Sequence, residues 1–279
     1  MHDHPPPGHP MPAHNGGGWD TVLAVTGVVA LAVAYLLLAH RGTDRAARPR
    51  DRWRTTMFLT GCTLLAAALL PPIAPFAHED FRGHMIQHML LGMYAPLALV
   101  LGAPITVLLR ALPTQRARNL TGVLRSRPMA VLAHPITALT LSTGSLALLY
   151  FTPLYDATTT RPALHWLLHA HFVLSGCLFA WAIAGPDPAP SRPSVKARLT
   201  VLGAAIALHA AIAQLMYGGF LIDVHAPIAQ VRGAAEIMYY GGDIAELLLA
   251  AALVATWHPA RRTTASRPRP QRTPGAAAR

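Results

Sequence analysis

Two pairs of histidines with four-residue spacing are the residues of this sequence best suited to bind a transition metal. His84 and His88 lie at the start of one long apolar segment, and His165 and His169 at the start of another. Residues four apart share a helix face, so each pair presents its imidazoles together. Histidine is a common transition-metal ligand and is costly to bury in a membrane without a partner. We expect the four imidazoles to converge on one metal if the two helices adjoin.

Thioether and further imidazole groups accompany these pairs. Met85 and Met89 form a second pair on the adjacent helix face, and His209 lies in a later apolar segment. Imidazole and thioether ligands together suit copper, whereas zinc more often binds cysteine or carboxylate. We therefore predict a copper site in which His209, Met85 and Met89 are alternate ligands. Hydrogen bonding between helices for the histidines, and core packing for the methionines, remain the alternatives.

The last apolar segment carries polar residues expected to support this site. They are Tyr240, Asp243 and Glu246. Charged groups inside a membrane are unfavourable unless they are paired, hydrated or protonated. A carboxylate bonded to the second nitrogen of a ligand histidine would also fix its tautomer. We expect Asp243 to do this, with Tyr240 and Glu246 close by, although the carboxylates could instead simply connect helices.

Seven apolar segments must position these side chains. Hydrophobic residues make up 53% of the chain and charged residues only 13%, which is poor in charge for a soluble domain. Each segment can cross a hydrocarbon layer of about 30 Å as a helix. The predicted fold is all-α, a polytopic bundle of seven transmembrane helices forming one domain over residues 19–258. The predicted spans are Thr21–Ala39, Thr55–Ile73, His84–Leu109, Met129–Phe151, His165–Ala184, Arg198–Tyr217 and Ile237–Trp257.

Lysine and arginine residues are concentrated in every second segment outside these spans, beginning with the loop that carries Arg41, Arg45 and Arg48. Basic residues are retained on the cytoplasmic side of a membrane. The pattern predicts that the N-terminus is outside and the C-terminus cytoplasmic, so that the histidine pairs face outward. Because topology and lipid contacts account for the net charge of +11, we do not expect nucleic-acid binding.

The two ends of the chain are expected to be disordered. Residues 1–18 are rich in His, Pro and Gly, and residues 259–279 form a basic tail that is expected to be cytoplasmic. The outer tail could collect metal for the site, or it could be solvated filler. Its candidate ligands are His2, His4, His9 and His14.

The run His84-Met-Ile-Gln-His-Met, followed by an apolar stretch ending in Leu101-Gly-Ala-Pro104, resembles the hallmark of the CtaG-type cytochrome c oxidase assembly factors, the Caa3_CtaG family. The His165-Trp-x2-His169 run and the seven-span layout are also similar, so the resemblance covers roughly residues 20–258. Many members carry an Asp-Gln pair before a Gly-Gly step, whereas here Asp243 follows the step. The resemblance implies an assembly factor for an aa3- or caa3-type oxidase in the bacterial plasma membrane, which helps to supply copper. Its partners would be oxidase subunits or other copper chaperones.

Two other functions use the same residues. A copper transporter or resistance protein would need ligands that continue to the inner face, where the sequence offers only Cys62, Cys177 and His134. A haem-binding membrane electron carrier would use His88 and His169 as axial ligands. No nucleophile constellation or phosphate-binding loop is present, so we expect no enzymatic activity.

Overall fold

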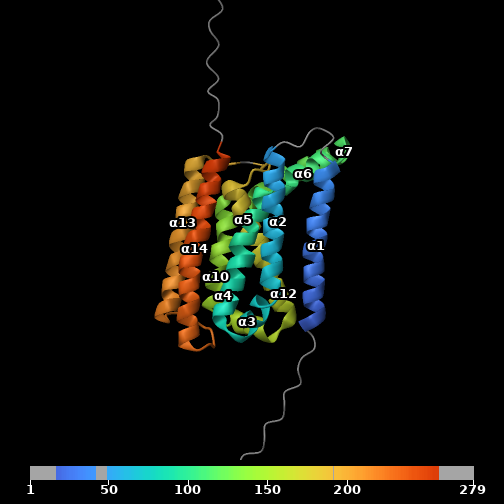
Figure 1. The fold of residues 1–279 in the computed structure, drawn as a ribbon. Coiled ribbons are helices and arrows are strands. Elements are labelled where there is room, and N and C mark those ends of the chain that lie inside the picture. The colour runs from blue at the N-terminus through green and yellow to red at the C-terminus, as the bar shows by residue number, and fades with distance from the viewer. Residues whose placement is uncertain (1–16, 42–48, 191, 258–279) are drawn as a thin grey trace, which may run out of the picture.

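The chain folds as a bundle of helices in the computed structural model, which describes residues 17–41, 49–190 and 192–257 (Figure 1). No strand occurs within these ranges. The expected basic tail, and the proposed collecting residues His2, His4, His9 and His14, lie outside the described residues. Helix α1 (Gly17–Arg41) already begins two residues inside the expected outer tail.

Five stretches in the described ranges are helical, long and apolar enough to cross a membrane, and two bent helix pairs raise the count to seven if each is one span. The five are α1, the run from α4 (Phe81–Met89) through η1 (Leu90–Tyr94) to α5 (Ala95–Leu101), α12 (Pro162–Ala184), α13 (Val195–Gly218) and α14 (Ile228–Thr256). The seven predicted spans correspond to the higher of these two counts. The orientation in the membrane stays a prediction.

The two bent pairs lie where the remaining two spans are predicted. Helix α2 (Pro49–Leu69) bends by 45° into the short α3 (Ile73–Glu79), because Pro71 and Pro72 interrupt it. The segment α9 (Pro135–Leu139), η2 (Thr140–Gly144) and α10 (Ser145–Tyr150) bends by 82° into α11 (Leu154–Thr160). The 82° bend lies at the end of the fourth predicted span, Met129–Phe151, and the start of that span belongs to a separate short helix, α8 (Arg127–Leu132).

The bundle has two distinct ends (Figure 1). The histidine end, at the bottom of the picture, contains α3 and the first residues of α4, α12 and α14. The arginine end, at the top, contains α6 (Pro104–Ala111) and α7 (Thr114–Leu124), which connect α5 to α8. Both candidate histidine pairs therefore start their helices at the same end.

The third predicted span, His84–Leu109, ends early in the structure, because Gly102 and Pro104 interrupt it. Helix α5 stops at Leu101, and Ala103 adopts a left-handed backbone with φ of 53° before Pro104 starts α6. The sequence did not indicate the π-helical turn η1, in which the Ala95 N–H donates to the Leu90 carbonyl. Pro96 has no N–H to offer to the Gly92 carbonyl four residues earlier, which disfavours regular helix here.

Helix α12 packs closely against this irregular turn. A Cβ added to Gly176 would lie 2.1 Å from the Gly92 carbonyl oxygen. Only glycine at position 176 therefore allows the two backbones to come this close. The contact brings α12 against the helix that carries His84 and His88.

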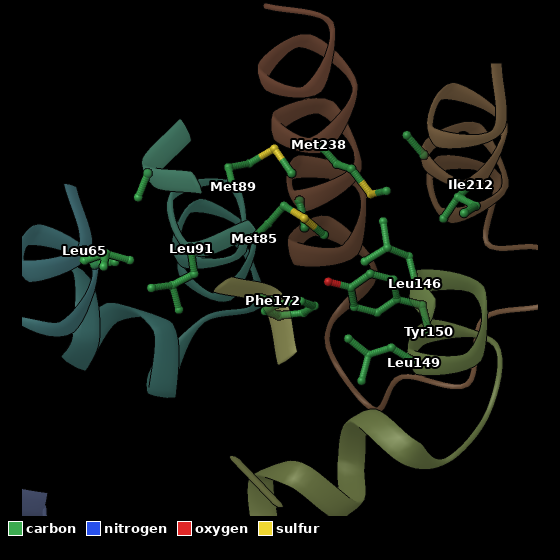
Figure 2. Packing of buried hydrophobic residues seen from close by; sticks show 14 of the residues in the cluster. Leu65, Met85, Met89, Leu91, Leu146, Leu149, Tyr150, Phe172, Ile212 and Met238 are labelled. Carbon is green, nitrogen blue, oxygen red and sulfur yellow. The ribbon is translucent and has the colours of Figure 1, made fainter. Parts of the chain in front are cut away.

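The core near the histidine end is built around methionine and aromatic side chains (Figure 2). Met85 and Met89 of α4 lie beside Met238 of α14, and Tyr150 approaches them from α10. All four residues are at most 4% exposed. Met85 and Met89 are therefore part of the apolar core, which is the packing role weighed as the alternative to copper ligation.

Candidate metal centre

A small cavity lies inside the bundle, between α12, α13, α14 and the two π-helical turns. It has a volume of about 40 Å³, and its wall includes His88, His209, Glu246, Met93 and Thr143. A space of this size holds one or two water molecules or a single metal ion, but no larger group. The cavity brings together two of the candidate ligands from helices far apart in the sequence.

The imidazoles that line this cavity have unused nitrogen atoms. Both ring nitrogens of His88, and Nε2 of His209, are buried without a hydrogen-bond partner. Buried polar atoms in proteins almost always have a partner, and leaving one unpaired costs about 1–3 kcal/mol. Three such atoms on two side chains at one cavity indicate a site arranged to bind something else.

The Glu246 carboxylate lies behind the His209 ring. Its Oε1 lies 3.4 Å from Nδ1 of His209, and both side chains are 4% exposed. A carboxylate so placed favours the tautomer with the proton on Nδ1, which leaves a lone pair on Nε2. This arrangement of carboxylate, histidine and free nitrogen is common behind metal-binding histidines.

A glycine lies against each of these rings. A Cβ on Gly242 of α14 would lie 2.7 Å from Cε1 of His209, so the ring rests directly against the α14 backbone. A Cβ on Gly92 would lie 3.4 Å from Cε1 of His88, whose ring also packs on Phe172 at 4.3 Å between centroids. A small residue is therefore required at Gly242, where His209 meets α14, whereas Gly92 lies one turn after His88 in the same span at an ordinary contact distance.

A second group of imidazoles lies at the histidine end. The ring centroids of His165 and His169 are 4.2 Å apart, and those of His78 and His165 are 5.0 Å apart. His84 lies near this group, with Nε2 3.3 Å from the Tyr150 hydroxyl and its ring 4.8 Å from that of Tyr155. The sequence did not single out His78, because it belongs to α3 and shares no helical spacing with the others.

The hydrogen bonds of Gln87 fix the protonation of His169. The Gln87 amide nitrogen donates to the Ala68 carbonyl at 2.8 Å, and its Oε1 lies 3.1 Å from Nε2 of His169. Because the Ala68 carbonyl can only accept, Oε1 must face the histidine, and Nε2 must donate to it. The proton is then on Nε2, and the buried Nδ1, which has no partner, carries a free lone pair.

The structure thus divides the four predicted ligands between two places. His84, His165 and His169 lie near one another at the histidine end, whereas His88, about 6 Å further along α4, lines the cavity with His209. Within the described ranges, no three His, Cys, Asp or Glu side chains form a group that could hold a metal ion. Metal ligation therefore stays a prediction, and the geometry offers pairs of imidazoles rather than one site of four.

The three polar residues of α14 have different environments. Glu246 contacts His209, Asp243 is partly exposed and Tyr240 is 66% exposed. The carboxylate behind a histidine is therefore Glu246 rather than Asp243. Residues three apart on a helix differ by about 60° in direction and about 4.5 Å along the axis, and of the two carboxylates it is that of Glu246 that lies against His209.

The loop between α13 and α14 is hydrogen-bonded to residues at the histidine end. The Asp223 N–H donates to the Tyr150 carbonyl at 3.0 Å, and His225 Nδ1 contacts the Asp156 carboxylate. The hydrogen bond to Asp156 raises the pKa of His225, which is exposed. The loop is thus bonded to Tyr150, whose hydroxyl meets His84.

The chain is similar to one protein family and to mycobacterial proteins. The family model described as cytochrome c oxidase caa3 assembly factor (Caa3_CtaG) matches residues 33–260. Among curated proteins, the uncharacterized proteins Mb0105 of Mycobacterium bovis and MT0111 of Mycobacterium tuberculosis are each 32% identical over 271 residues, covering 89% of this chain and 40% of their own. The uncharacterized protein ML1998 of Mycobacterium leprae is 36% identical over 202 residues, covering 69% of this chain and 30% of its own. The chain thus spans less than half the length of these relatives, and no solved structure matches.

Proposed function

We propose, from the premise that this chain belongs to the Caa3_CtaG family of cytochrome c oxidase caa3 assembly factors, that it binds copper between His88 and His209 and passes it to an oxidase. The role is one of carrying and delivery, without catalysis. The apolar helices place the protein in a membrane, and we propose the plasma membrane of a bacterium, with the histidine end outside.

One observation carries the proposal: His88 and His209 present unpaired buried nitrogens to a cavity of about 40 Å³. Cu(I) is satisfied by few ligands and accepts both imidazole and thioether, and Met93 lines the same cavity. Glu246 adds a negative charge behind His209. The site therefore supplies two nitrogen ligands, an optional sulfur and a counter-charge for a monovalent ion.

The imidazoles at the histidine end would bind the copper ion first. His169, whose Nδ1 carries the free lone pair, has its ring centroid 4.2 Å from that of His165, and His84 lies on α4 one turn before His88. Copper captured at these imidazoles would need to move only about one helical turn to reach the cavity. Sites with few ligands release metal readily, which suits delivery to a partner.

The proposed recipients are oxidase subunits, and other copper chaperones are proposed donors or recipients. The longer relatives share only part of their length with this chain, so their remaining segments are not represented here. A haem-carrying role is less well supported, because His88 and His169 do not face one cavity and about 40 Å³ cannot hold a ligand of that size.

The proposal is tested in cells that depend on this protein for oxidase assembly. Membranes from cells carrying His88→Ala should contain oxidase subunits with at least about tenfold less copper than wild type, the lower limit expected when a metal site is disrupted. His134→Asn is the matched control, since His134 is an exposed helix-capping residue and asparagine also caps helices well. Normal oxidase copper in the His88→Ala cells would contradict the proposal. Copper uptake into proteoliposomes by the purified protein would instead favour transport.

A further inference from the structure

A lateral groove lies on the side of the bundle toward the arginine end, with α1 at one of its edges. Its volume is about 670 Å³, and it is lined by Leu31 of α1, Phe58 of α2, and α12 between His171 and Trp181. The lining is almost entirely apolar. Since these are candidate membrane-spanning helices, the groove is open to the hydrocarbon of the bilayer rather than to water.

Helix α1 packs against α2 and α6, and it also forms one wall of the groove. Tyr35 is the one buried side chain in the described part of α1. Its hydroxyl donates to the Gly102 carbonyl at 2.8 Å, and its ring stacks on Phe58 at 3.9 Å between centroids. Leu31 lies one turn before Tyr35 and therefore faces the groove from the same side of α1.

One residue of the groove wall has a buried polar atom without a hydrogen-bond partner. The indole Nε1 of Trp181 is buried without a hydrogen bond, and the residue is 8% exposed. The other polar groups of the lining are satisfied: His171 contacts Ser145 at 2.9 Å, and Asp187 accepts from the backbone at the start of α6. Since an indole N–H can only donate, the groove lacks a hydrogen-bond acceptor at Trp181.

The dimensions of the groove decide what could occupy it. Along α12, the lining runs from His171 to Trp181, which is about 15 Å at the helical rise per residue. This is half of a hydrocarbon layer of about 30 Å, the depth of one leaflet. A second transmembrane helix would occupy on the order of 2000 Å³, so it cannot enter the groove. The volume instead falls within the range of about 300–1000 Å³ that is typical of small-molecule sites.

We propose that this groove binds one phospholipid of the leaflet at the arginine end, with an acyl chain along α12 and an ester carbonyl accepting from the Trp181 indole. Trp181 lies three residues before the end of α12, near the depth where ester groups meet the hydrocarbon. The lipid fills the space between α1 and α12 and supports the position of α1. The inference is independent of copper binding at the other end of the bundle.

The experiment measures phospholipid retained after purification in detergent, by phosphorus content and native mass spectrometry. Wild-type protein should keep one phospholipid per chain. Leu174→Trp, which puts a bulky ring into the groove from an exposed position, should lose it, whereas Leu247→Trp on α14 should not, because Leu247 is similarly exposed but lines no described pocket. Trp181→Phe removes the donor alone and should lower the affinity for lipid about fivefold, the value of one net hydrogen bond.

Copper binding at His88 should be the same in all four proteins, which separates this inference from the proposed function. Equal lipid content in the Leu174→Trp and Leu247→Trp proteins would overturn the inference, as would wild-type protein without bound phospholipid. A second protein chain seated on α1 and α12 in the native complex would also overturn it.

Discussion

A single added methyl group on α14 should separate copper binding from folding. In Gly242→Ala the new Cβ would lie 2.7 Å from Cε1 of His209. Carbon atoms in contact are about 3.5–4.0 Å apart, so the ring must move by about 1 Å. That shift displaces Nε2 from its place at the cavity and changes the contact between Nδ1 and Glu246.

The effect on stability should be small, because two contributions oppose each other. Alanine favours a helix over glycine by about 1 kcal/mol, while inserting a methyl group into a packed core costs about 1–3 kcal/mol. The net loss of stability is then about 0–2 kcal/mol. The affinity for copper should fall by about 10–100-fold, which is typical when the groups that position a metal ligand are disturbed.

Gly203→Ala on α13 is the matched control. No atom lies within 4 Å of a Cβ added there, so this variant should gain up to about 1 kcal/mol and bind copper normally. Thermal unfolding and Cu(I) competition with a chromophoric chelator would measure the two quantities. A Gly242→Ala protein that is destabilised but binds copper with wild-type affinity would refute the assignment of His209 as a ligand.

Three further changes should each affect one contact. Gly176→Ala places its Cβ 2.1 Å from the Gly92 carbonyl oxygen, and it should lower stability by about 1–3 kcal/mol in chemical unfolding; an unchanged midpoint would contradict the close packing of α12. Gln87→Leu leaves its two hydrogen-bond partners unpaired, and it should cost about 1–3 kcal/mol by the same measurement. The raised pKa of His225 means that its pairing with Asp156 stabilises the loop fully below the unfolded pKa and is lost as pH rises through the folded value. Hydrogen exchange of residues 220–226 should therefore quicken with rising pH beyond its intrinsic dependence, and Asp156→Asn should abolish that excess.

Hydropathy and residue spacing predicted the parts of this fold that depend on local sequence. The apolar segments are helical, the histidine pairs start their helices at the same end, and the third span ends at Gly102 before Pro104. These features follow from side-chain type and from the two residues, proline and glycine, that interrupt helices.

Two kinds of feature could not be predicted from the sequence. One is contact between segments that are distant in the sequence, and the other is helix that continues past the end of an apolar segment. Helix α14 begins at Ile228, nine residues before the predicted span, because nothing after Pro227 interrupts the helix where it leaves the hydrocarbon. Hydropathy detects apolar length and cannot detect such an extension. The pairing of His209 with Glu246 depends on the rotation of α13 against α14, which no local pattern encodes.

The split of the four imidazoles has the same cause. The i, i+4 rule placed His84 and His88 on one face of α4, but the two residues differ in depth by a full turn and meet different neighbouring helices. His88 therefore joins His209, a residue predicted only as an alternate ligand. The role of these side chains in copper binding remains a prediction.

The most direct test is the copper content of the purified protein after loading with Cu(I) and removal of loosely bound metal. The account predicts one tightly held copper ion per chain in wild type, with nitrogen neighbours in its X-ray absorption spectrum, and loss of that ion in both His88→Ala and His209→Ala. A wild-type protein that retains no copper, or a double variant that retains as much as wild type, would contradict it.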